Sequence, residues 1–105
     1  MTNHNALQNM VTEFLEWSHW FVFPNVEGRS KSGRSTYAGI TDLTAIKAGV
    51  TLWIEIKVGA DTLRDSQEEF KFEVTTHGGH WIECRDGMDE LLSYIEQLRK
   101  QGNKI

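Results

Sequence analysis

Two acidic residues and one lysine stand in the middle of the chain with types and spacing that could do chemistry. Glu55 and Lys57 lie two residues apart inside an otherwise apolar run, and Asp42 precedes them. Two carboxylates that share a site repel each other unless a cation lies between them. Such hard oxygen ligands favour Mg²⁺ or Mn²⁺ over zinc. A bound cation would activate water, and the ammonium group could stabilise charge on a phosphoryl oxygen, so these residue types suit phosphodiester hydrolysis.

The elements that must position these side chains are two neighbouring β-strands. Residues 51–58 alternate between aliphatic positions and the positions of Trp53, Glu55 and Lys57, which predicts a strand with both charges on one face. Residues 39–46 are predicted to form its hairpin partner, with Gly49 in the turn and Asp42 within the strand. Paired strands lie about 5 Å apart, so Asp42 and Glu55 could reach one ion if they share a face.

A simpler interpretation of Glu55 and Lys57 is a solvated strand face with a cross-strand ion pair. The apolar residues around them and the central place of this run in the chain instead favour an inner strand that is covered on both faces. Buried charges without a task are rare. The sequence therefore favours a functional site over a solvated surface.

The remaining apolar patterns predict a single α/β domain over residues 1–105. Capping boxes that start at Thr62 or Ser66 leave the start of the second helix open, and the tail at 101–105 is expected to be frayed. The order of elements is αβββαβα, an α/β sandwich with a mixed sheet of about four strands. Its predicted helices cover residues 5–18, 62–76 and 88–98, and its outer strands cover residues 19–23 and 80–84.

Composition narrows the class of protein and its partners. The single Cys84 can form no internal disulfide, which favours a reducing, cytoplasmic setting, and it is predicted to be a buried strand residue. No apolar stretch reaches membrane-spanning length, so no membrane partner is expected. A net charge of −4 argues against coating of nucleic acid by bulk electrostatics. Acidic residues that hold a cation also lower this sum, however, while the bound cation makes the site locally positive.

Positive charge is concentrated in residues 27–37, a predicted mobile loop that contains Arg29, Lys31 and Arg34. These side chains either keep an exposed loop soluble or grip a phosphate backbone beside the site. Arg64 adds a further positive charge near the helix that carries Gln67. The four basic residues are therefore the candidate DNA contacts.

Four motifs occur in an order that resembles the VRR-NUC branch of the PD-(D/E)xK nuclease superfamily, which typically shows G-x-P-D-L, (I/V)-E-x-K and L-x-x-x-Q. Here they are Gly39-Ile40-Thr41-Asp42-Leu43, Trp53-Ile54-Glu55-Ile56-Lys57, Leu63 followed by Gln67, and Gly78-Gly79 before a strand. The resemblance implies a restriction-endonuclease-like sandwich. It also implies that Asp42, Glu55 and the carbonyl of Ile56 bind the metal. Lys57 would then be catalytic, with Gln67 supporting the site.

Two positions depart from the family pattern. Thr41 replaces a proline that shapes a turn and supplies no chemistry. The first helix of the family commonly carries an acidic residue near its start, where this chain has His4 between two asparagines. His4 is either a substitute contact or a surface residue, and Glu13 and Glu16 are alternative acidic candidates from the same helix.

By its resemblance to small stand-alone members, the chain is expected to be a structure-selective DNA endonuclease of phage type. Such proteins act in the cytoplasm of the host cell on branched or Holliday junction-like DNA, as homodimers with Mg²⁺ or Mn²⁺. A core of this size does not readily cover all four tryptophans, Trp17, Trp20, Trp53 and Trp81, which also favours a dimer. Two alternatives remain, a catalytically inactive nucleic-acid-binding module with the same fold and a protein-binding domain whose charges form ion pairs.

Overall fold

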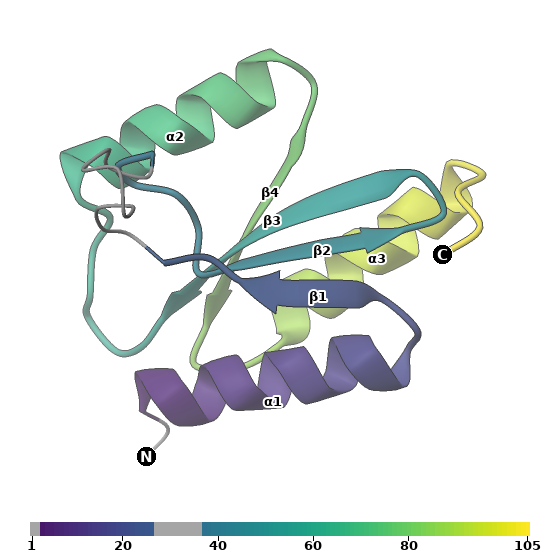
Figure 1. The fold of residues 1–105 in the computed structure, drawn as a ribbon, viewed down its shortest axis with the longest axis horizontal. Helices are drawn as coiled ribbons and strands as arrows, with labels where there is room; N and C mark the ends of the chain where they lie inside the picture. Colours follow the sequence, from purple (N-terminus) through teal and green to yellow (C-terminus); the bar gives the residue numbers. More distant parts are fainter. Residues whose placement is uncertain (1–2, 27–36) are drawn as a thin grey trace, which may run out of the picture.

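The computed structural model describes residues 3–26 and 37–105, which form elements in the order αβββαβα that the sequence predicts (Figure 1). Asn3 caps the first helix, because its side chain accepts a hydrogen bond from the amide of Ala6 at 2.8 Å. The helices are α1 (His4–Trp17), α2 (Asp65–Thr76) and α3 (Asp89–Lys100). The strands are β1 (Phe21–Pro24), β2 (Leu43–Lys47), β3 (Val50–Lys57) and β4 (His80–Arg85).

The four strands of the described residues form one mixed sheet in the order β1-β2-β3-β4. The first two pairings are antiparallel, and β3 pairs with β4 in parallel through the crossover that contains α2. Strand β3 is therefore an inner strand, as predicted. Both of its faces are covered, since Ile54 and Ile56 are fully buried on one face and Glu55 is 2% exposed on the other.

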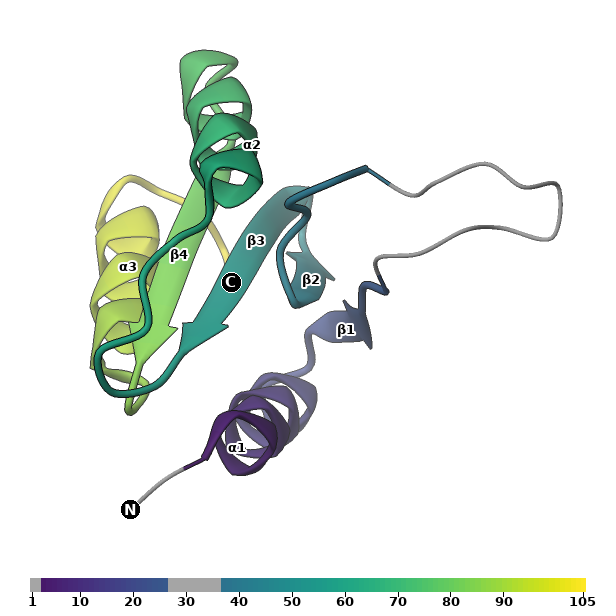
Figure 2. The ribbon, with the colours of Figure 1, turned by 90° about the vertical axis from the view of Figure 1, so that its left-hand side faces the viewer.

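The helices divide between the two faces of the sheet (Figure 2). One face packs on α1 and α3, whose apolar stripes enclose the main core with residues such as Leu52, Ile54 and Cys84. Full burial of one such aliphatic side chain is worth about 1.5–3 kcal/mol. The other face is covered by α2, where Phe70 contacts the ring of Trp53 and Lys71 lies over the ring of Trp81. This second face is the one that carries Glu55 and Lys57.

The predicted strand at residues 39–46 is wrong at its start, because the chain turns until Asp42 and β2 begins only at Leu43. Gly39 has a φ of +80°, and a Cβ atom there would lie 2.0 Å from the backbone oxygen of Ser66. This close approach of backbone to backbone holds the segment against the start of α2 instead of against β3. Asp42 consequently lies in the turn before β2, and not within a strand.

Two other elements begin a few residues later than predicted. Strand β1 begins at Phe21 and not at His19, because His19 has a φ of +69° and its amide donates to the carbonyl of Glu16 in a turn that closes α1. Helix α2 begins at Asp65, and neither predicted capping box forms its start. The side chain of Gln67 instead accepts a hydrogen bond from the amide of Arg64 at 2.9 Å.

The C-terminal tail is packed, so the expectation of a frayed end is wrong. Ile105 is only 8% exposed and joins the main core. The side chain of Asn103 donates to the carbonyl of Leu98 at 2.9 Å, and the Arg99 guanidinium donates to the carbonyl of Ile105 at 2.7 Å. The first bond gives a partner to a backbone carbonyl at the end of α3, and the second holds the tail against this helix. None of the helices in residues 3–26 and 37–105 has the length and apolarity needed to cross a membrane.

Candidate functional site

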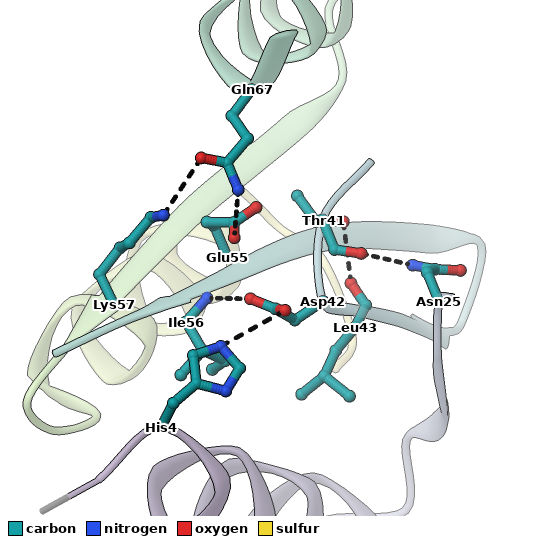
Figure 3. Close-up of polar contacts among 9 residues, drawn as sticks. All are labelled: His4, Asn25, Thr41, Asp42, Leu43, Glu55, Ile56, Lys57 and Gln67. Carbon is teal, nitrogen blue, oxygen red and sulfur yellow. Dashed lines mark hydrogen bonds and ion pairs between the residues drawn. The ribbon is translucent and has the colours of Figure 1, made fainter. Parts of the chain in front are cut away.

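The side chain of Gln67 joins the two charged residues of β3 (Figure 3). Its amide nitrogen donates to Glu55 Oε1 at 3.3 Å, and its oxygen accepts from Lys57 Nζ at 3.1 Å. The same oxygen accepts from the backbone amide of Arg64, which fixes the side chain at the start of α2. Gln67 therefore sets the positions of the carboxylate and the ammonium group relative to each other. All three side chains are buried, with Gln67 at 6% and Lys57 at 8% exposure.

Asp42 reaches the same place from the turn before β2. Its Oδ2 accepts a hydrogen bond from the backbone amide of Ile56 at 2.8 Å, and its Oδ1 lies 3.4 Å from His4 Nε2. The carbonyl of Asp42 also accepts from the amide of Asn25 at 2.9 Å, which ties this turn to the end of β1. The carboxylate is thus held at the edge of β3 where β2 has turned away.

Glu55 is buried without a full set of partners. Its Oε2 atom is inaccessible to solvent and has no hydrogen-bond partner among residues 3–26 and 37–105. The pKa of Glu55 is raised from 4.5 to about 9, chiefly by burial and next by the adjacent Asp42 carboxyl group, whose effect outweighs the lowering by Lys57 and Arg64. In the absence of a cation, the Glu55 side chain therefore stays protonated at neutral pH.

A divalent cation fits this environment, because it would supply the partner that Glu55 Oε2 lacks and would neutralise two adjacent carboxylates. The carbonyl of Ile56 points to the same side as Asp42. In a strand the amide and carbonyl of one residue point to the same edge. The Ile56 amide faces Asp42, whereas the Lys57 carbonyl accepts from the Asp86 amide on the β4 side. The predicted donors Asp42, Glu55 and Ile56 are therefore neighbours.

No group of three or more His, Cys, Asp or Glu side chains that could hold a metal ion occurs in the part of the chain that the structure describes. Two carboxylates and a carbonyl still match the usual manner of Mg²⁺ binding, in which one or two carboxylates bind and water completes the shell. The donor set is consistent with a hard cation and offers no thiolate for a soft one.

The structure brings His4 to the site and leaves Glu13 away from it. His4 is 41% exposed, yet its ring contacts Asp42, so it is more than a surface residue. Glu13 lies nine residues further along α1, about 13 Å along the helix axis. Glu16 is exposed and lies further still from the start of the helix. Of the predicted first-helix residues, His4 is therefore the one that lies beside Asp42.

Of the predicted DNA contacts, only Arg64 falls within the described residues. Arg64 is exposed at the N-terminus of α2, directly before the helix that carries Gln67. The other three, Arg29, Lys31 and Arg34, lie in residues 27–36, outside the described part of the chain. The proposed role of this basic segment stays a prediction.

Strand β4 contributes two charged residues that the sequence reasoning missed. In the parallel register Glu83 lies beside Glu55, and Arg85 lies beside Lys57. The Arg85 Nε atom donates to Glu83 Oε2 at 3.1 Å, and its Nη1 donates to the carbonyl of Gly59 at 2.7 Å. A sequence signal for these two residues exists, because Glu83 and Arg85 stand two residues apart in the same way as Glu55 and Lys57 in β3.

Neither a protein-family model nor a curated protein sequence matches this chain. The likeness to the VRR-NUC branch therefore depends on the ordered motifs and on the site that those motifs form.

Proposed function

We propose that this chain is a metal-dependent nuclease of the VRR-NUC type, with a restriction-endonuclease-like sandwich, that hydrolyses DNA phosphodiester bonds with Mg²⁺ or Mn²⁺. The observation that carries the proposal is the buried Glu55 carboxyl group beside Asp42, with one oxygen that has no hydrogen-bond partner in the part of the chain that the structure describes. A polar group in this state destabilises the fold unless a ligand satisfies it. A cation is the ligand that two adjacent carboxylates select.

The burial of the charges argues against a purely structural role. A solvated face with a surface ion pair would leave Glu55 and Lys57 exposed, but they are 2% and 8% exposed. The neutral amide of Gln67 lies between the two charged groups, so it positions the Lys57 ammonium group without neutralising its charge as a direct ion pair with Glu55 would. Buried polar networks with an unsatisfied member are more typical of functional sites than of stabilising cores.

Each residue then has a defined role. Asp42, Glu55 and the carbonyl of Ile56 would hold the cation, which when bound lowers the pKa of water and polarises a phosphate oxygen. Lys57 orients the attacking water or stabilises charge that develops on the phosphoryl oxygens. Gln67 holds Lys57 at a set position relative to Glu55.

The preferred substrate that we propose is branched or Holliday junction-like DNA, bound by a homodimer. Large apolar side chains remain on the surface and support an interface, since Trp17 is 83% and Phe21 is 65% exposed. Two copies would present two sites and two basic segments, which helps an acidic chain to hold DNA. The alternative is a catalytically inactive nucleic-acid-binding module with the same fold, which would bind DNA without cutting it.

A cleavage assay on labelled duplex, flap and four-way-junction DNA tests the proposal. Wild-type protein should cut at least one substrate with Mg²⁺ or Mn²⁺ and none in EDTA. Glu55→Gln should bind DNA but not cut it, whereas the matched control Glu16→Gln, at an exposed position of α1, should cut normally. DNA binding without cleavage in every arm would favour the inactive module. Near-wild-type cleavage by Glu55→Gln would refute the assigned site.

A further inference from the structure

Beside the proposed metal site lies an aromatic cluster made from three separate segments, Tyr37, Trp53 and Phe70. The ring of Phe70 is central, with its centroid 5.5 Å from that of Tyr37 and 5.5 Å from that of Trp53. Exposure increases outward across the cluster. Phe70 is 8% exposed and Trp53 is partly buried, whereas Tyr37 is 53% exposed. The ring pairs meet at interplanar angles of 60° and 79°, so Tyr37 is the outer ring of a cluster that is packed edge to face.

The cluster adjoins the site along two elements. Trp53 precedes Glu55 by two residues on the same face of β3, a separation of about 7 Å. Phe70 follows Gln67 by three residues, which is close to one turn of α2. Because Lys57 lies on the far side of Glu55 along the strand, the aromatic cluster and the lysine flank the carboxylates from opposite sides.

Tyr37 is held in place by its own backbone. Its carbonyl accepts a hydrogen bond from the amide of Ile40 at 3.2 Å, which closes a turn. Within this turn the backbone of Gly39 packs directly on the backbone of Ser66 at the start of α2, so closely that only glycine fits there. A tyrosine ring has only two rotatable side-chain bonds, so a pre-positioned ring loses little conformational entropy when it binds a flat ligand.

We propose that Tyr37 stacks on an unpaired nucleobase of the nucleotide next to the scissile phosphate. This inference rests on the proposed nuclease function and names the part of the substrate that lies beside the site. Stacking on aromatic rings is tolerant of sequence, because every base has a π-face, but that face is accessible only when the base is unstacked and unpaired. Tyr37 would thus direct the enzyme to the unpaired nucleotides of flaps and junctions.

Single exposed aromatic side chains are common on protein surfaces, so exposure by itself does not mark a ring that binds a base. Phe72 is a matched case, being 64% exposed on the same helix as Phe70. It follows Phe70 by two residues, which places it on a different face of α2, away from the sheet. Phe72 therefore serves as the control for an exposed ring that does not belong to the cluster.

Binding of fluorescent oligonucleotides, measured by anisotropy with Ca²⁺ as the divalent ion, tests the role of Tyr37. Tyr37→Ala should weaken binding to a flap by about 5- to 150-fold, the range that corresponds to loss of one base stack. Binding to fully paired duplex should change by less than about twofold, because paired bases offer no free face. Tyr37→Phe and the control Phe72→Ala should bind flap DNA as the wild type does, and the salt dependence should be unchanged because no phosphate contact is removed.

An abasic site beside the cleavage position completes a double-mutant cycle with Tyr37→Ala. The abasic flap should weaken binding to the wild type and have little further effect on the variant. Tyr37→Leu, which keeps an apolar side chain against Phe70, provides a second variant if Tyr37→Ala is poorly folded. Equal losses on flap and duplex, additive losses in the cycle, or wild-type flap binding by both variants would overturn the proposal.

The outcomes separate base stacking by Tyr37 from the proposed nuclease activity. If flap binding depends on Tyr37 but the protein cuts no DNA, the stacking proposal stands and the nuclease proposal is refuted. Cleavage that requires metal and Glu55 but is indifferent to Tyr37 would retain the nuclease and refute the stacking. A protein that binds neither flap nor duplex would overturn both.

Discussion

Replacing Glu55 with glutamine should stabilise the protein in the absence of metal, by an amount that grows with pH. The reason is the raised pKa of this carboxyl group, which is 4.5 ordinarily and about 9 in the folded protein, chiefly because of burial. Between these two values the folded protein keeps a proton that the unfolded chain releases. The stability linked to Glu55 is therefore fully present below pH 4.5 and is lost progressively as the pH rises towards 9.

The size of the effect follows from the shift. Each pH unit in this window lowers the free energy of unfolding by about 1.4 kcal/mol, so at about pH 7 the wild type has lost about 3 kcal/mol relative to its stability in acid. Glutamine does not titrate and has nearly the same shape. Its oxygen can still accept from Gln67, and its amide nitrogen occupies the place of the Oε2 atom that has no partner. The variant should not show this loss.

Urea unfolding in EDTA, followed by tryptophan fluorescence between about pH 5 and pH 8.5, measures the difference directly. The free energy of unfolding of Glu55→Gln should exceed that of the wild type by an amount that increases with pH, at equal m-values. Saturating Mn²⁺ should raise the free energy of unfolding of the wild type and not that of the variant, which removes much of the difference between them. The reason is that metal binding to the folded state adds RT ln(1 + [Mn²⁺]/Kd) to the stability. Parallel pH profiles for the two proteins would refute the assignment of a buried, protonated Glu55.

Four further outcomes are expected from the site and the fold. Lys57→Ala should reduce the cleavage rate by about 100-fold or more. It should still bind Mn²⁺ with unchanged affinity in calorimetry, because the ammonium group is not proposed as a metal ligand. A matching loss of metal affinity would show that Lys57 only positions the carboxylates. Light scattering at micromolar concentration should report a mass near twice 12.1 kDa, and a monomeric mass would count against the dimer. The double variant Arg29→Ala with Arg34→Ala should weaken DNA binding and reduce its salt dependence while leaving metal binding intact. Unchanged DNA binding would count against a role for the basic segment. Gly39→Ala should lower stability by at least about 2 kcal/mol in urea, since its Cβ would collide with the Ser66 backbone at a φ of +80°; wild-type stability would show that this contact can relax freely.

Much of the fold could be predicted from local patterns, because periodicity depends on which residues are apolar and not on distant contacts. The alternation around Glu55 and Lys57 predicted a strand with both charges on one face, and the structure confirms an inner strand buried on both sides. The apolar stripe of α1 predicted a helix that differs from the observed one by one residue at each end. The buried position of Cys84 was also predicted correctly.

The residues of the candidate site could be named from the sequence, but their arrangement could not. Asp42 lies in a turn because Gly39 packs on the backbone of Ser66, a contact between segments far apart in the chain. The contact of His4 with Asp42 likewise depends on where α1 packs, and no local pattern encodes that. The register that sets Arg85 beside Lys57 is a property of a parallel strand pair, which forms only across a crossover.

The state of Glu55 was decided by tertiary structure alone. A glutamate in an apolar run is charged at neutral pH in the unfolded chain, and the sequence determines only that its neighbours are aliphatic. Its proton is retained because α2 covers that face of the sheet, removes water from the carboxyl group and leaves Asp42 close to it. Desolvation acts through everything packed around a group in three dimensions, and only the folded chain brings those atoms together.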